Sequence, residues 1–170
     1  MKTLVVGIGN RLFGDDYIGS LLVELLSKTL TAPNVNFVSL EHDMYALLSF
    51  DFEKISKLVI VDAALIEEDY KVVKINSIED LEALAEFSTS SHGLSVTDIL
   101  RIVLELNKKL LGNTYLLFIK VDNLELRECI TENVVFRALQ LLRKLFELTS
   151  IDYNEDTIRK LEESLRKYVC

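Results

Sequence analysis

The sequence predicts an α/β fold in which helices cover both faces of a mostly parallel sheet. Short apolar runs alternate with longer segments of helical period along the 170 residues. The run 57–61 is apolar in nearly every position, as expected for a central strand that is covered on both faces. The connection from this run to 70–75 is too short for a crossover helix, so we expect one antiparallel strand. We therefore predict a three-layer α/β/α sandwich around a mixed, mostly parallel five-stranded sheet.

We predict each element from the spacing of its apolar residues and from the turn or capping residues at its ends. The expected strands are 4–8, 36–40, 57–61, 70–75 and 114–121. The expected helices are 16–30, 44–50, 77–86, 95–111, 131–148 and 154–168. Ser77, Ser95 and Thr131 are the expected N-caps of three of these helices. Because crossovers between parallel strands are right-handed, these helices should lie on both faces of the sheet.

Length and charge limit the classes of function. We interpret residues 1–170 as one domain, and the 49% apolar content argues against disorder. The net charge of −8 disfavours a nucleic-acid partner, which needs a clustered basic surface. The apolar runs are far shorter than the ~20 residues of a membrane span, and the N-terminus lacks the features of a signal peptide. We therefore expect a cytoplasmic protein without a membrane partner.

The two cysteines, Cys129 and Cys170, do not have the spacing of a metal site. Structural disulfides are rare in a reducing cytosol. We therefore expect two free thiols, one half-buried and one at a loose C-terminus.

Three polar residues lie next to the ends of predicted strands or the start of a predicted helix, where α/β proteins often place functional residues. Asp16 follows the first strand, Asp62 ends the run 57–61, and His92 lies in the loop before the helix that begins at Ser95. In open α/β sheets, ligands bind outside the carboxyl ends of the strands. Two carboxylates and one imidazole leave coordination positions open for outside ligands, so the three residues form a candidate metal site.

Each of these residues also has a structural explanation. Asp15 and Asp16 could stabilise the free N–H groups of a helix start, and Asp62 could cap the following turn. A lone loop histidine such as His92 is usually a surface residue. For His42, which follows the second strand, we expect a surface turn.

Other catalytic motifs are incomplete or absent. Gly7-x-Gly9 suggests a dinucleotide loop, but Leu12 stands where the third glycine belongs. The sequence contains no Walker A, G-x-S-x-G or H-E-x-x-H pattern. The loop serines beside His92 are too close to it in sequence to be a usual nucleophile–base pair. We therefore do not expect a serine hydrolase or a nucleotide-binding domain.

Four separated motifs resemble those of the hydrogenase maturation endopeptidases, in the same order and in the same elements. They are Gly7-Ile8-Gly9-Asn10, Asp15-Asp16 with Gly19, Val61-Asp62-Ala63, and Ser91-His92-Gly93-Leu94. The resemblance covers roughly residues 1–149, so the helix within 150–170 is expected to be an addition.

The resemblance implies a metal-dependent endopeptidase that removes a C-terminal extension from the large-subunit precursor of a nickel-iron hydrogenase. It implies a mixed five-stranded sheet with one antiparallel strand. It also implies that Asp16, Asp62 and His92 contact the metal, and we take Asp16 as the general base. We expect nickel already bound in the precursor to be the recognition element, rather than a metal that activates water. Zinc or cadmium are possible surrogates.

The sequence departs from the family pattern at three places. Tyr17 replaces the glycine that usually follows the acidic pair, and a ring there could narrow the cleft or contact the substrate tail. The segment 40–44 lacks the usual Asp and Gly-Thr pair, and 120–123 lacks the usual proline. These departures leave an alternative function open, in which a relative binds the precursor or a metal but does not cleave.

Overall fold

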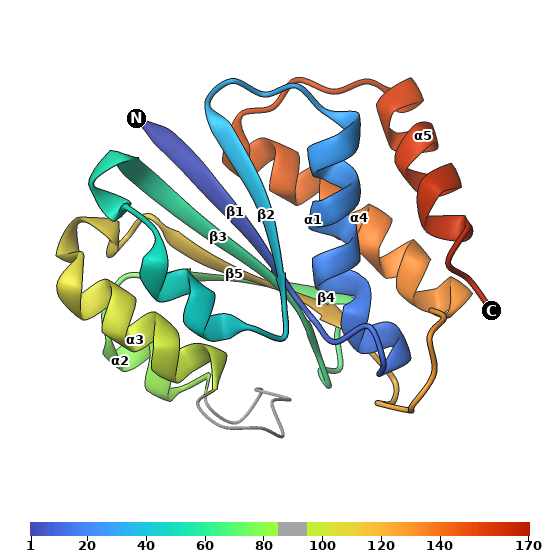
Figure 1. The fold of residues 1–170 in the computed structure, drawn as a ribbon, viewed down its shortest axis with the longest axis horizontal. Helices are drawn as coiled ribbons and strands as arrows, with labels where there is room; N and C mark the ends of the chain where they lie inside the picture. Colours follow the sequence, from blue (N-terminus) through green and yellow to red (C-terminus); the bar gives the residue numbers. More distant parts are fainter. Residues whose placement is uncertain (85–94) are drawn as a thin grey trace.

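The sheet has the predicted mixed topology. The computed structural model describes residues 1–84 and 95–170. The strands are β1 (Lys2–Ile8), β2 (Val35–Glu41), β3 (Ile55–Ala64), β4 (Tyr70–Ile75) and β5 (Thr114–Lys120). Their order is β2-β1-β3-β5-β4, and every pair is parallel except β4 with β5 (Figure 1). The antiparallel strand therefore lies at the sheet edge beside β5, and β1 and β3 are adjacent and parallel as the candidate site requires.

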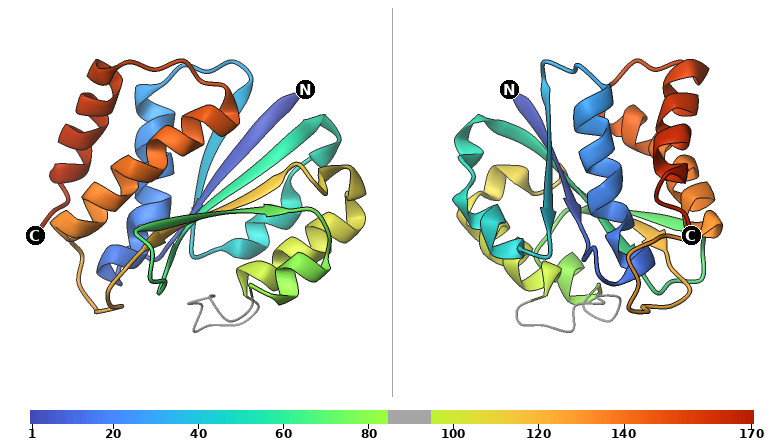
Figure 2. Two further views of the ribbon diagram at one scale, coloured as in Figure 1. Left: turned by 180° about the vertical axis from the view of Figure 1, so that it is seen from behind. Right: turned by 45° about the vertical axis from the view of Figure 1, so that its right-hand side comes forward.

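Helices cover both faces, which confirms the three-layer sandwich. One face carries α1 (Ile18–Thr29), α4 (Glu132–Thr149) and α5 (Glu155–Arg166). The other carries α2 (Glu79–Glu82), α3 (Val96–Leu106) and the 3₁₀ turn η2 (Met44–Ser49) (Figures 1 and 2). Of the helices within the described ranges, none is long and apolar enough to cross a membrane.

The central strands build two cores because their side chains alternate between the two faces. In β3, Val59 and Val61 pack into the core under α1 and α4, whereas Leu58 and Ile60 pack into the core under α3. All four side chains are fully buried. The nearly unbroken apolar run of β3 is therefore explained by burial on both faces.

Several element boundaries differ from those predicted, and three of the differences concern the site or the end of α3. A 3₁₀ turn, η1 (Gly14–Tyr17), precedes α1, so Asp16 lies before the helix. Strand β3 continues to Ala64, so Asp62 lies inside its carboxyl end rather than after it. Helix α3 ends at Leu106 because the Asn107 side chain donates a hydrogen bond to the Val103 carbonyl, and a 3₁₀ turn η5 (Lys108–Leu110) follows.

Two of the three predicted caps are confirmed. Ser95 forms a reciprocal capping box with Asp98 at the start of α3. Thr131 accepts a hydrogen bond from the Val134 N–H at the start of α4. The N-cap of α2 is Ile78 rather than Ser77, whose N–H instead donates to the Asp80 carboxylate.

The expectation of two free thiols is wrong, because Cys129 and Cys170 form a disulfide with their Cα atoms 5.2 Å apart. After α5 the chain returns beside the segment that leads into α4. There the Ile130 N–H donates to the Tyr168 carbonyl, and the Cys170 N–H donates to the Ile130 carbonyl. This backbone pairing brings two cysteines 41 residues apart within bridging distance. The C-terminus is therefore fastened to the body of the protein, not loose.

Candidate active site

Two glycines let the start of α1 approach the ends of β1 and β3 at backbone distance. A Cβ on Gly19 would lie 2.5 Å from the carbonyl oxygens of both Ile8 and Val61. A Cβ on Gly9 would lie 1.9 Å from the Asp16 carbonyl oxygen, and Gly9 has a φ of 144°. Both spaces exclude any side chain, so only glycine fits. This contact sets the turn that carries Asp16 beside the end of β3, which carries Asp62.

Asp16 and Asp62 therefore lie at the same carboxyl edge of the sheet, as predicted, and close enough for the charge of Asp16 to act on Asp62. Asp62 is 6% exposed, and one of its oxygens accepts a hydrogen bond of 2.8 Å from the Ala63 N–H. Asp16 is half-buried, and its Oδ2 accepts a hydrogen bond of 2.8 Å from the Asn10 N–H. No Lys, Arg or His among the described residues forms an ion pair with either carboxylate.

Burial, and for Asp62 also the charge of Asp16, make these two carboxylates hold protons more tightly than ordinary carboxylates do. Burial, and then the negative charge of Asp16, raise the pKa of Asp62 to about 7, while the Ala63 N–H opposes the shift. Burial also raises the pKa of Asp16, against the opposing effect of the Asn10 N–H. A proton or a cation bound between the two groups would offset the cost of burying negative charge and the repulsion of Asp62 by Asp16. Carboxylate oxygens are also suitable ligands for a cation.

His92, the third predicted residue, lies outside the described residues, as do the loop serines beside it. Its role remains a prediction. Within residues 1–84 and 95–170, no group of three or more His, Cys, Asp or Glu side chains is arranged to hold a metal. His42 is exposed in the turn after β2, as expected.

Asp15 has a structural role, although it adjoins Asp16 in sequence. Its side chain is 2% exposed and accepts hydrogen bonds from the Thr131 N–H (2.7 Å) and hydroxyl (2.8 Å). The Arg127 guanidinium lies 3.3 Å from the same carboxylate without the alignment of a hydrogen bond. Asp15 therefore fastens the turn η1 to the start of α4. The Thr131 cap was predictable, but no sequence signal pointed to Arg127 as a partner.

Tyr17 does not narrow a cleft, contrary to the expectation from the sequence. It is 3% exposed, and its hydroxyl donates to Glu24 and accepts from Arg11. The Arg11 guanidinium lies over the ring at 4.8 Å and forms ion pairs with Glu24 and Glu41. The ring thus packs into the core, and its hydroxyl joins the loop after β1 to α1.

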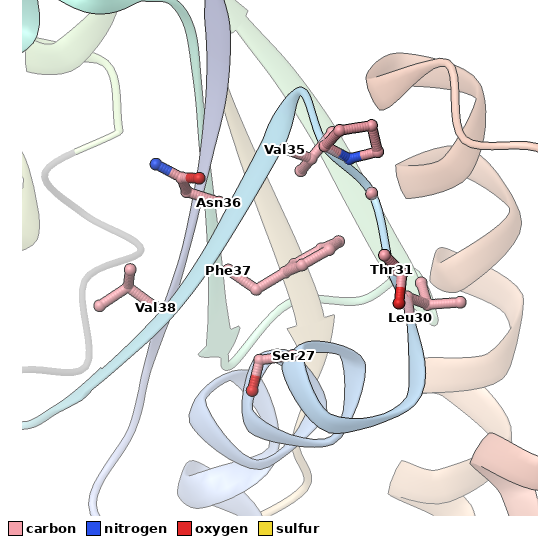
Figure 3. A pocket seen from close by; sticks show the side chains of 9 residues that line it. Ser27, Leu30, Thr31, Val35, Asn36, Phe37 and Val38 are labelled. Carbon is pink, nitrogen blue, oxygen red and sulfur yellow. The ribbon is translucent and has the colours of Figure 1, made fainter.

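A hollow lies elsewhere, between the end of α1 and the edge strand β2 (Figure 3). Phe37, Val35 and Leu30 line it together with Ser27 and Thr31. It contains no titratable side chain, and it lies away from the carboxyl ends of the strands. Its residues offer no group for acid–base or metal chemistry, so the carboxylate pair remains the candidate active site.

Comparison with known proteins finds similarity to proteins of the kind that the motifs indicate. No protein-family model matches the chain. A curated protein of Methanocaldococcus jannaschii, provisionally named a hydrogenase maturation protease, is 29% identical over 99 residues. The aligned segment covers 58% of this chain and 64% of that relative.

Solved structures extend the likeness to most of the chain. The hydrogenase maturating endopeptidase HybD from E. coli has a TM-score of 0.69 at 23% identity, covering 86% of this chain and 91% of its own. A HybD protease from Thermococcus kodakarensis has a TM-score of 0.68 at 21% identity, covering 88% and 99%. The chain has the fold of the hydrogenase maturation endopeptidases. The resemblance that the four motifs indicate is thereby confirmed, and so is the mixed α/β sheet of these endopeptidases.

The two adjacent aspartates should respond differently to mutation. Asp15→Ala leaves the Thr131 N–H and the Arg127 guanidinium without their carboxylate, so we expect a loss of about 3 kcal/mol in the free energy of unfolding. Asp16→Ala removes a repulsive charge and should cost much less. Urea unfolding of the two variants measures the difference. Equal stability of the two variants would contradict the structural role of Asp15.

The Asp62 carboxyl should make stability fall as pH rises. Its pKa is about 7 in the folded protein, above the ordinary value of 3.8. Between these values the folded protein keeps a proton that the unfolded chain loses, so the free energy of unfolding decreases with rising pH and levels off above pH ~7. Asp62→Asn removes this contribution to the pH dependence of stability.

Urea unfolding with a chelator present tests this. The stability of Asp62→Asn relative to wild type should increase from pH ~5 to pH ~8, by up to a few kcal/mol. Glu53→Gln, at an exposed carboxylate before β3, is the matched control and should show no such increase. The same difference at both pH values would show that Asp62 ionises normally.

Proposed function

We propose that this protein is a hydrogenase maturation endopeptidase that removes a C-terminal extension from a nickel-loaded hydrogenase large-subunit precursor. The observation that carries the proposal is the pair of neighbouring carboxylates, the half-buried Asp16 and the buried Asp62, at the carboxyl edge of a sheet with the fold of these endopeptidases. His92 completes the ligand set in the proposal. The likeness of sequence and fold supports the class of reaction and the kind of partner.

Nickel enters this proposal with the substrate, because it is already bound in the precursor. A raised pKa means that the Asp16–Asp62 pair holds a proton readily near neutral pH. A cation brought to the pair would favour the ionised carboxylates and displace that proton. Binding of the precursor at the site then depends on its nickel. A precursor without nickel lacks the positive charge that the two carboxylates would bind.

Hydrolysis also needs a group that moves a proton. The reaction adds water across one peptide bond, so a base must take a proton from the water and the leaving nitrogen must receive one. Asp16 is the more accessible of the two carboxylates and is our proposed base. Asp62 is buried and fixed by the Ala63 N–H, so we assign it to binding the cation.

Cleavage of a purified precursor tests the proposal. Wild type should shorten the nickel-loaded large subunit, visible as a faster band on a gel, and should leave the nickel-free precursor intact. Asp16→Ala, Asp62→Ala and His92→Ala should each reduce the rate by at least about 100-fold, as expected for residues that bind or move reacting groups. His42→Ala is the matched control for the histidine, because His42 is exposed after the neighbouring strand β2.

The outcomes separate the proposal from its alternative. Full activity in the Asp16 or Asp62 variant would contradict the assignment of the site. Binding of the nickel-loaded precursor without cleavage by wild type would instead support a non-cleaving binding protein. The burial of Tyr17 removes one reason for that alternative, because its ring does not obstruct the site.

A further inference from the structure

The net charge of the protein is concentrated at the edge of the sheet that holds the candidate site. The segments at and after the carboxyl ends of the parallel strands are 9–17, 41–43, 62–69 and 120–131. They contain eleven acidic and three basic residues. Their net charge of −8 equals that of the whole chain, so the remaining residues are balanced.

The three basic side chains of these segments are engaged within the protein. Arg11 pairs with Glu24 and Glu41, and Arg127 lies against Asp15. Lys120 donates to the backbone carbonyl of Glu67. From α4, Arg137 forms ion pairs with Asp69 and Asp122.

Several carboxylates of this edge remain uncompensated. The side chains of Glu67, Glu68 and Glu128 are exposed and have no hydrogen bond or ion pair with other described residues. The buried Asp62 accepts one hydrogen bond, from its neighbour Ala63, within the same described part of the chain. This edge therefore has a negative electrostatic potential that attracts a cationic partner.

Large apolar side chains are also exposed in the segments at this edge. Leu12 is 50% exposed, Leu65 is 55% exposed and Leu126 is 78% exposed. Leu65 directly follows β3, and Glu67 and Glu68 come next in the chain. Leu126 lies two residues before Glu128. Exposed apolar and acidic residues are therefore interspersed in the segments at this edge.

The backbone segments that carry Leu12 and Leu126 are joined to each other by hydrogen bonds. The Arg127 N–H donates to the Leu12 carbonyl (3.0 Å), and the Gly14 N–H donates to the Arg127 carbonyl (2.8 Å). The disulfide of Cys129 and the hydrogen bonds of Asp15 fix the same segment from the other side. An exposed side chain on a braced segment loses little further freedom when a partner covers it, so it is well suited to binding.

We propose that Leu12, Leu65 and Leu126, with Glu67, Glu68 and Glu128, form a docking surface for a protein segment that carries both cationic and apolar side chains. The inference rests on the proposed function for the identity of the partner, which is the precursor that the site processes. The exposed leucines bind its apolar side chains, and the uncompensated carboxylates select and attract its cationic ones. These residues belong to the same segments at the carboxyl edge as Asp16 and Asp62, so docking there would bring the chain to be cut toward the site.

The test compares variants of this surface with matched controls at the opposite edge. Leu126→Ala is paired with Leu106→Ala, because Leu106 is 76% exposed at the far end of α3. Glu67→Lys after β3 is paired with Glu53→Lys before β3. The Kd for the nickel-loaded precursor is measured on a biosensor, and KM and kcat are measured for its cleavage.

We expect Leu126→Ala and Glu67→Lys each to raise Kd and KM by about fivefold or more with little change in kcat. Both controls should match wild type. Binding by wild type should weaken as the salt rises from about 50 to about 300 mM, and less so for Glu67→Lys. Equal Kd and KM in all four variants, or binding insensitive to salt, would overturn the docking surface.

The proposed function can fail separately. If wild type binds the precursor but does not cleave it, the proposed activity is wrong, and the four Kd values still decide whether the surface docks the partner. If wild type cleaves normally and the surface variants behave like their controls, the activity stands and the docking surface is wrong. A precursor that wild type does not bind overturns the docking surface as well.

Discussion

The candidate site depends on the close backbone contact between the start of α1 and the ends of β1 and β3. Gly9 and Gly19 leave no room for a Cβ at this contact, so the turn η1 lies directly against the sheet. That position brings Asp16 near the buried Asp62. Burial raises the pKa of both carboxyls, and the charge of Asp16 raises that of Asp62 further. A larger residue at either glycine would separate the two carboxylates and weaken their interaction.

The neighbouring residues stabilise this arrangement without taking part in the chemistry. Asp15 holds η1 to the start of α4 through Thr131. Tyr17 and Arg11 join the same loop to α1 and to the end of β2. A flexible pair of carboxylates would move apart to reduce its repulsion, so this rigidity preserves the raised proton affinity and the proposed affinity for a cation.

Much of this could be predicted from the sequence, because local patterns determine it. The apolar run of β3 and the short connection to β4 predicted a mixed sheet with one antiparallel strand. Parallel strands carry their following residues to one edge, which predicted the meeting of Asp16 and Asp62. The separate roles of Asp15 and Asp16 could not be predicted, since adjacent residues in a turn point in directions that only packing decides. The disulfide was missed because the return of the chain after α5 brings Cys170 to Cys129, and no local pattern encodes that return.

The central claim is that Asp16 and Asp62 form one electrostatically coupled site, and the titration of the Asp62 carboxyl tests it most directly. Carbon-13 NMR of the metal-free protein can follow this carboxyl across pH in wild type and in Asp16→Asn. The account predicts a midpoint near pH 7 in wild type and a lower midpoint when the charge of Asp16 is removed. A midpoint near pH ~4 in both proteins would contradict it, because it would mean that Asp62 is neither desolvated nor close to Asp16.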